Sequence, residues 1–253
     1  MNNLVKSKEQ IKLIRQSSRI LAVTLRALKK KAEVEIYLME LEHLARKVIV
    51  DAGAKPAFLG YQPKGARKPY PAALCTSLND VIVHGVPHDY VLQDGDILSL
   101  DLGVDFNGGI SDAAVTIGIG KTKNEDKKLI TIVQKALNAG IDQIKAGNTT
   151  GDIGHAIEQV IFSNKGKVID GLVGHGVGNE VHEEPAIYNF GEPGDGVLLE
   201  VGMVLAIEPM ASMKNSRIVQ LTDDSYATAD GSNAAHFEHT VLVTERRGDI
   251  LTA

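Results

Sequence analysis

Two aspartates, Asp101 and Asp112, lie in a stretch that has the pattern of a β-hairpin. Residues 98–104 alternate between apolar and polar or small types, as a half-buried strand requires, and residues 110–117 are typical of the returning strand. A turn centred on residues 106 and 107 would make the two aspartates direct cross-strand partners, with Cβ atoms about 4.5–5.5 Å apart. Carboxylates held that close repel each other unless a proton or a cation lies between them. The hairpin is therefore a candidate metal cradle, and the alternative is the solvated face of an edge hairpin.

Three later residues could share this site. His175 lies in a Gly-His-Gly-Val-Gly stretch, Glu208 ends an apolar strand just before a proline, and Glu238 lies in the last long strand pattern. With the two aspartates they provide four carboxylates and one imidazole, and four negative charges would balance two divalent cations. Oxygen-rich ligation with a single nitrogen suits Mn, Fe, Co or Zn. Without metal, such a cluster would raise several pKa values and cost stability.

The elements that must position these residues can be traced by their periodicity. Ser7 and Gln10 have the spacing of a capping box, and the apolar positions that follow predict a long helix ending at residues 29–31. A second helix is predicted from Leu38 to about Gly53. Residues 54–73, which are rich in proline, glycine and lysine, are predicted to form a loop that leads into strands.

The same order of elements then occurs again. A helix predicted over residues 126–145 and a shorter one after Thr150 repeat the helix pair, and the Gly-His-Gly-Val-Gly stretch repeats the earlier His84-Gly85-Val86. We interpret this as an internal duplication. It predicts one domain over residues 1–253 with two pseudo-symmetric halves, about 1–120 and 121–253, and a site where they meet.

Composition limits the class of protein. The chain has 253 residues, 43% of them hydrophobic and 23% charged, which is typical of a soluble globular protein. A net charge of −5 gives no basic signature, so we expect no direct nucleic-acid function. No apolar run approaches the roughly 20 residues that span a bilayer, and a single cysteine fits a reducing compartment. We therefore expect a cytoplasmic protein without membrane association.

The motifs, taken in order, resemble those of the methionine aminopeptidases in their bacterial, type I form. The resemblance covers nearly the whole chain, from the first helix to about Val243, and there is no long insertion of the kind found in type II enzymes. It is carried by His84-Gly85-Val86-Pro87, Ser99-Leu100-Asp101-Leu102-Gly103, Ser111-Asp112-Ala113-Ala114, Gly174-His175-Gly176-Val177-Gly178 with His182-Glu183-Glu184-Pro185, Ile207-Glu208-Pro209 and Phe237-Glu238-His239-Thr240.

This resemblance implies the pita-bread fold, an α+β architecture. In that fold two pseudo-twofold halves curve an antiparallel sheet around a dimetal site, with helices outside. The resemblance also implies that Asp101 chelates one metal ion, that His175 and Glu208 bind the other, and that Asp112 and Glu238 bridge both. The two divalent ions could be Co, Mn, Fe or Zn, because ligands of these types serve several metals.

The activity implied is that of a methionyl aminopeptidase, a metalloprotease that removes the N-terminal methionine from nascent polypeptides with a small second residue. A hydroxide bridging the two metals would attack the scissile carbonyl. Glu208 would carry the proton, His182 would contact the carbonyl oxygen, and His84 would hold the amide nitrogen of the scissile bond. The expected partners are nascent peptide N-termini at the ribosome, and the family suggests a monomer.

In this family a small apolar pocket accepts the methionine side chain. The resemblance assigns that pocket to Tyr61, Tyr70, Cys75, Val181 and Tyr226. Val181 stands where bacterial relatives usually carry phenylalanine, and Tyr226 where they often carry tryptophan. A wider pocket would relax the selectivity for methionine, since one methylene of fit is worth only about 1–3 kcal/mol.

Three questions stay open at this point. The extra basic stretch over residues 63–68 is either a solvated loop or a contact to ribosomal RNA. An X-Pro aminopeptidase or prolidase would share the five ligands, although those relatives usually carry a separate N-terminal domain. A pita-bread protein that binds partners without catalysis is the third alternative, and the presence of every ligand argues against it.

Overall fold

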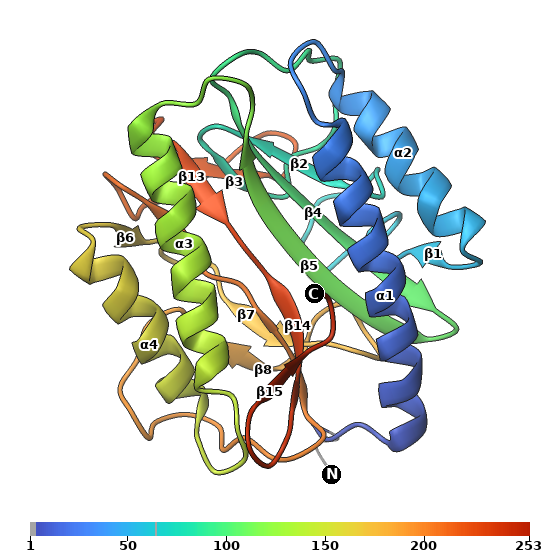
Figure 1. Ribbon diagram of the computed structural model, residues 1–253, viewed down its shortest axis with the longest axis vertical. Helices are drawn as coiled ribbons and strands as arrows, with labels where there is room; N and C mark the ends of the chain where they lie inside the picture. The colour runs from blue at the N-terminus through green and yellow to red at the C-terminus, as the bar shows by residue number, and fades with distance from the viewer. Residues whose placement is uncertain (1–3, 64) are drawn as a thin grey trace.

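Two pairs of helices flank the strands that meet in the middle of the molecule, as Figure 1 shows. The computed structural model describes residues 4–63 and 65–253. The helices are α1 (Lys8–Lys31), α2 (Leu38–Asp51), α3 (Asn124–Asp142) and α4 (Thr150–Ser163). The strands are β1 (Lys55–Pro56), β2 (Cys75–Leu78), β3 (Val81–Val83), β4 (Ile97–Phe106), β5 (Gly109–Gly118), β6 (Lys167–Val168), β7 (Gly174–Gly176), β8 (Glu183–Ile187), β9 (Val204–Ile207), β10 (Met210–Ser212), β11 (Ile218–Gln220), β12 (Tyr226–Thr228), β13 (Ala234–His236), β14 (His239–Val243) and β15 (Gly248–Ile250).

The helices follow the sequence prediction closely. In α1 the Ser7 hydroxyl accepts the N–H of Gln10 and the Gln10 side chain accepts the N–H of Ser7, so the predicted capping box is confirmed. Helix α3 begins and ends two to three residues earlier than the predicted 126–145. The chain tightens there, because the N–H groups of Gln143 and Ile144 bond to carbonyls three residues back.

The four strands of the first sheet lie in the order β1-β4-β2, with β5 on the other side of β4, and helices α1 and α2 cover one face. The leucines of β4 join the core beneath these helices. The opposite face, with Ser99 and Asp101, is buried as well. Strand β4 is therefore covered on both faces and is not the half-buried strand that its alternating pattern predicted, because the second half of the chain packs against its polar face.

The register of the β4–β5 hairpin differs from the prediction by two residues. Asp101 faces Ala114 and Asp112 faces Gly103, so the aspartates are diagonal neighbours on one face and not direct cross-strand partners. The turn is centred on Asn107 and Gly108, whose φ angles are 53° and 85°. A two-residue type I′ turn needs positive φ at both central positions, and Asn-Gly adopts this readily whereas a phenylalanine does not.

Gly108→Ala is expected to lower the free energy of unfolding by about 1–2 kcal/mol, because a Cβ disfavours the left-handed conformation by that amount. A Cβ at this position would meet no atom within 4 Å, so the effect is purely conformational. Urea denaturation measures it, and Asn107→Gly is the control that keeps both positive φ angles and should cost well under about 1 kcal/mol. Equal stability of Gly108→Ala and the parent chain would contradict this account of the turn.

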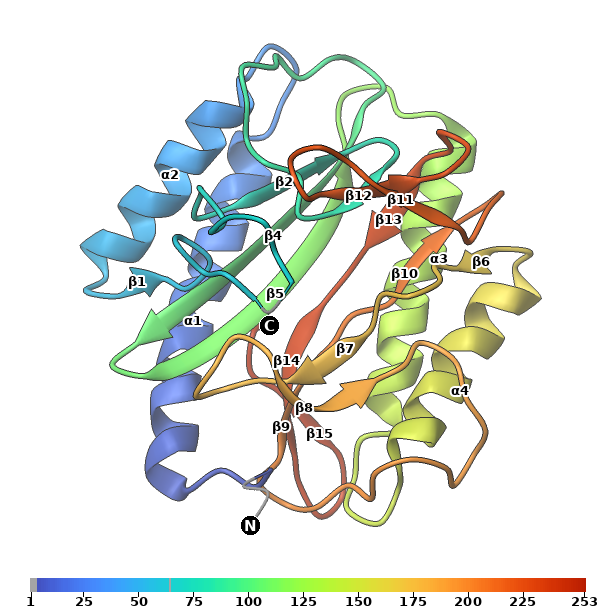
Figure 2. The ribbon, with the colours of Figure 1, turned by 180° about the vertical axis from the view of Figure 1, so that it is seen from behind.

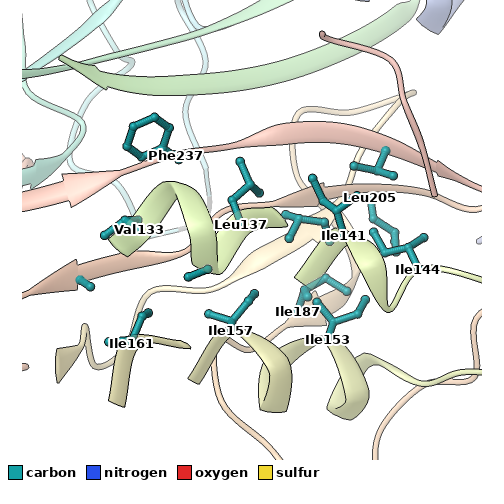
Figure 3. Packing of buried hydrophobic residues seen from close by; sticks show 14 of the residues in the cluster. Val133, Leu137, Ile141, Ile144, Ile153, Ile157, Ile161, Ile187, Leu205 and Phe237 are labelled. Atoms are coloured by element: carbon teal, nitrogen blue, oxygen red, sulfur yellow. The ribbon is translucent and has the colours of Figure 1, made fainter. Parts of the chain in front are cut away.

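A second core lies beneath α3 and α4, over the five-stranded sheet β15-β14-β9-β7-β8. Figure 3 shows how both helices direct their branched side chains at each other and at these strands. The helices approach closely at Gly140, where a Cβ would lie 2.8 Å from the Ile157 side chain. The labelled residues are Val133, Leu137, Ile141, Ile144, Ile153, Ile157, Ile161, Ile187, Leu205 and Phe237.

Two smaller sheets complete the fold, β13-β10-β6 and β11-β12-β3. Figure 2 shows the strands of both halves lying between the two helix pairs. Among the described residues, no helix is long and apolar enough to cross a bilayer.

Candidate metal centre

Carboxylates and histidines from both halves converge on one cavity of about 320 Å³. Asp101 on β4 and Asp112 on β5 come from the first half; His175 on β7, Glu208 after β9 and Glu238 between β13 and β14 come from the second. Four of these five are at most 8% exposed, and the Glu208 side chain is 11% exposed. The structure thus brings together all five residues that the sequence singled out as ligands.

Two threonines join the halves beside the cavity. The Thr240 hydroxyl donates to the Asp112 carbonyl (2.7 Å) and accepts the Asp112 N–H (2.9 Å). The Thr116 hydroxyl makes the same pair of bonds with the backbone of His236, at 2.7 and 2.8 Å. These reciprocal bonds link β5 to His236 at the end of β13 and to Thr240 on β14, on either side of Glu238, and they fix the backbone that carries Asp112 and Glu238.

The donor atoms are close enough to share an ion. Asp112, His175 and Glu238 each offer one ligand atom, and the three atoms lie within 4.8 Å of one another. The Nδ1 atom of His175 is 2.9 Å from the Gly176 carbonyl oxygen. Since Nδ1 must donate its proton to that carbonyl, the Nε2 lone pair is left for a metal.

Several buried oxygens of the cluster are unpaired. Among the described residues, Asp101 Oδ1, Asp112 Oδ1 and Glu238 Oε1 have no hydrogen-bond partner. An unpaired buried oxygen costs free energy, so its presence needs an explanation. Buried oxygens beside one imidazole are the donors that borderline divalent ions prefer, and the residues therefore fit a divalent metal.

The pKa values of the carboxyl groups also favour a bound cation. Burial raises the pKa of Asp101 and Glu238 well above the usual range, and the charge of Asp112 adds to both effects. Burial also raises the pKa of Asp112, to about 6. Glu208 is the exception, because the rings of His175 and His236, 3.2 and 3.5 Å from its carboxylate, outweigh burial and hold its pKa at about 2. The cluster resists full ionisation at neutral pH without a cation.

His84 and His182, which the sequence assigned to the substrate, also line the cavity. His84 follows β3 with a left-handed φ of 61°, a strained conformation that is common at functional sites. The His182 ring lies 4.4 Å from the ring of His175, and its Nδ1 is 2.8 Å from the Tyr61 hydroxyl. Burial lowers the pKa of both, that of His182 to about 4, so both rings are neutral at pH 7.

Four of the five residues assigned to the substrate pocket line this cavity: Tyr61, Tyr70, Cys75 and Tyr226. Val181 is buried in a cluster with Phe58 and Cys75, which do line it, so Val181 supports the wall from behind. Tyr226 pairs with Val83 across the β12–β3 ladder, which places its ring 6.0 Å from that of His84.

The basic stretch over residues 63–68 lies at the same cavity. Pro63, Gly65, Ala66 and Lys68 line it, and Arg67 forms a 3.4 Å ion pair with Asp224. Lys64 lies outside the described residues. The two alternatives for this stretch, a solvated loop and a contact to ribosomal RNA, both stay open.

Sequence reasoning passed over His236. This residue is 1% exposed, and its Nε2 lies 3.5 Å from Glu208 Oε2 and 4.0 Å from Glu238 Oε2. The signal was present, since His236 precedes Glu238 by two residues in an extended segment and such residues share a face. Phe58, which lines the pocket, was missed as well, and its place within a loop gave no periodic signal.

Comparison with known proteins identifies the family of the chain. The model of the family described as "Metallopeptidase family M24" matches residues 12–245. The chain is 42% identical to the methionine aminopeptidase of Clostridium perfringens and 39% identical to methionine aminopeptidase 1 of Bacillus subtilis, over 98% of each chain in both cases.

Comparison with solved structures leads to the same family. The methionine aminopeptidase of Thermotoga maritima superposes with a TM-score of 0.93 at 40% identity, over 98% of both chains. The prolidase of Pyrococcus furiosus shares the fold with a TM-score of 0.77 at 23% identity, but the match spans 65% of that longer chain. The chain therefore belongs to metallopeptidase family M24 and has its pita-bread fold, with the bacterial methionine aminopeptidases as its relatives.

Proposed function

We propose that this protein is a methionyl aminopeptidase that releases the N-terminal methionine of polypeptides with a small second residue. The observation that carries the proposal is the convergence of four carboxylates and a histidine on one cavity that also has an aromatic and apolar wall. Divalent metal bound there would supply a Lewis acid, which acidifies water and polarises a carbonyl group.

The five residues are assigned as ligands of two ions. Asp101 would hold one ion, His175 and Glu208 the other, and Asp112 and Glu238 would lie between them. Two ions are favoured over one because four carboxylates balance two divalent charges. Mn, Fe, Co and Zn all suit this donor set.

Glu208 is assigned as the group that moves the proton. Its neighbours His175 and His236 keep the carboxylate ionised at neutral pH, as its pKa of about 2 indicates. An ionised carboxylate that faces the cavity can take a proton from attacking water and pass it to the leaving amine.

The two neutral histidines are assigned to the scissile peptide group. The Tyr61 hydroxyl, 2.8 Å from Nδ1 of His182, can donate to that atom and leave the proton on Nε2. His182 can then donate to the carbonyl oxygen while negative charge develops there. His84 would hold the amide nitrogen, and Tyr61, Tyr70, Cys75 and Tyr226 would surround the methionine side chain, with Val181 behind them.

The organisation of the chain is part of the proposal. Residues 1–253 would be one catalytic domain with halves of about 1–120 and 121–253. Each half lays a helix pair over its own strands, and each contributes one threonine to the reciprocal bonds beside the cavity. We propose further that the enzyme acts as a monomer in the cytoplasm, on nascent chains at the ribosome.

Metal-stripped protein reconstituted in turn with Mn, Fe, Co and Zn is expected to release methionine from Met-Ala-Ser. Release of leucine from Leu-Ala-Ser should be slower by about 10–200-fold, the range that apolar pocket contacts can supply. Comparable release of leucine would keep the mechanism and contradict the selectivity. Faster cleavage of Ala-Pro-Ala would favour the X-Pro aminopeptidase, and no activity with any metal would contradict the proposal.

A further inference from the structure

Lys6 is a buried lysine at the start of the described chain. Its side chain is 2% exposed and pairs with the carboxylate of Glu183, 177 residues away in the sequence. Lysines are almost never buried to this extent unless they are paired. The aliphatic part of Lys6 passes over Gly178, where a Cβ would lie 2.9 Å from Lys6 Cε. This close approach packs Lys6 against the turn that starts at Gly178.

The second oxygen of Glu183 organises that turn. Glu183 Oε1 accepts the backbone N–H groups of Asn179 and Glu180, at 2.6 and 2.9 Å. Gln10 on α1 donates to the Asn179 side chain at 2.6 Å, which adds a second bond from the same end of the chain. The carboxylate of Glu183 thus connects Lys6 to the backbone of residues 178–183, which we call the 178–183 turn.

This turn carries His182 into the cavity. His182 directly precedes Glu183, and its ring contacts His175 and the Tyr61 hydroxyl. The ring is therefore positioned by the backbone that the Lys6–Glu183 pair holds. Neither Lys6 nor Glu183 is among the described residues that line the cavity, so neither would touch the substrate.

We propose that Lys6 and Glu183 are positioning residues that hold His182 at the scissile carbonyl. The inference rests on the role proposed above for His182. Without the ammonium group, the largely buried carboxylate of Glu183 keeps its two N–H donors but has no counter-ion, so rotation of this side chain toward water is favoured. The N–H groups of Asn179 and Glu180 then lose their acceptor, and the turn shifts. A displacement near 1 Å can cost about 10²-fold in rate.

The test compares Lys6→Met in two backgrounds, the metal-loaded parent chain and His182→Ala, with Met-Ala-Ser as the substrate. In the parent background kcat should fall by about 10–100-fold with KM nearly unchanged, since the contact to His182 matters most in the transition state. In the His182→Ala background the same change should cost less than about 2-fold, because two residues that act through one contact are not additive. Lys6→Arg keeps the charge and should recover most of the rate.

Controls separate this role from general destabilisation. Lys12→Met replaces an exposed lysine on the next turn of α1 and should leave kcat unchanged. If Lys6→Met does not fold, Glu183→Ala serves in its place: it removes the acceptor of the two N–H groups and should show the same dependence on His182.

Two results would overturn the inference: an unchanged kcat in a folded Lys6→Met variant, or an equal loss in both backgrounds. A parent chain that releases no methionine would instead contradict the proposed function, so the two failures can be told apart.

Discussion

Glu208→Gln is expected to lower kcat/KM for Met-Ala-Ser by at least about 10³-fold while the fold is retained. General acid–base catalysis alone contributes about 10²–10⁴-fold, and a neutral amide cannot accept the proton. Glutamine has nearly the same shape, and the bond from the Asn189 side chain to the carbonyl of residue 208, 3.0 Å long, does not depend on the side chain. The substitution removes the charge that His175 and His236 stabilise, and with it a carboxylate ligand of the proposed metal site, so the metal is supplied at saturating concentration.

The measurement is steady-state hydrolysis at saturating metal, with thermal unfolding recorded on the same preparations. Glu200→Gln replaces an exposed glutamate eight residues earlier and should behave as the parent chain does. Retention of more than about a tenth of the parent rate, a barrier change under about 1.4 kcal/mol, would show that another group carries the proton.

Local signals in the sequence were sufficient for the helices and for the longer strands, such as β4, β5 and β9. Ser7 and Gln10 marked the start of α1 because a capping box is a contact between residues three apart. The hairpin turn was wrong by one position because it was centred to pair Asp101 with Asp112. The Asn107-Gly108 dipeptide was the stronger signal, since it meets the backbone requirement of a type I′ turn. The backbone conformation that a turn requires is therefore a better guide to hairpin register than the assumption that two functional residues face each other.

The sequence was sufficient to predict which residues form the candidate site, but not which contacts hold them in place. Ordered motifs identified Asp101, Asp112, His175, Glu208 and Glu238. All but His175, whose strand β7 is Gly-His-Gly, occur on or directly beside a strand with an apolar pattern. The place of His236 depends on pairing with Met210 and on the Thr116 hydroxyl, both of which are distant in the sequence. The Lys6–Glu183 pair is a similar case, because no periodic pattern connects residues 177 positions apart. Contacts between the halves arise only from the tertiary fold.

Divalent metal is expected to raise the unfolding temperature of the metal-stripped protein more at pH 7.5 than at pH 5.5. In the metal-free fold, burial raises the pKa of Asp101 and Glu238, and raises that of Asp112 to about 6. Raised carboxyl pKa values mean that the folded state binds protons more tightly than the unfolded state does. Their stabilisation is present below the unfolded pKa near 4 and is lost as the pH rises through the folded values.

The other two members of the cluster do not reverse this trend. Burial alone would lower the pKa of His175, but the carboxylate of Glu208 raises it, so its contribution is also lost as the pH rises. The lowered pKa of Glu208, about 2, gives stability that is present above 4.5 and is lost only in stronger acid. Between pH 5.5 and 7.5 that contribution is constant, so the five cluster residues together destabilise the metal-free protein as the pH increases. The lowered pKa values of the buried His84, His182 and His239 act in the opposite direction.

Metal binding acts in the opposite direction, because it needs deprotonated ligands and releases their protons. At 100 times the dissociation constant a ligand stabilises the fold by about 2.7 kcal/mol. For a chain of this length that corresponds to about 5–10 °C at pH 7.5, and protonation of Asp112 and its neighbours should reduce the shift at pH 5.5. Differential scanning calorimetry with and without Mn would measure both values.

Asp112→Asn separates repulsion among the carboxylates from other effects of pH. The amide is isosteric and neutral, so this variant should be more stable than the parent chain at pH 7.5 when both are metal-free, and metal should stabilise it much less. The same pH dependence of metal-free stability in the parent chain and in Asp112→Asn would show that these buried carboxyls are not under electrostatic strain. If Asp112→Asn stabilises the metal-free protein and also loses the response to metal, repulsion among the carboxylates is the free-energy cost of a preformed metal site. The charges that destabilise the empty cluster are then the same charges that attract the metal ions.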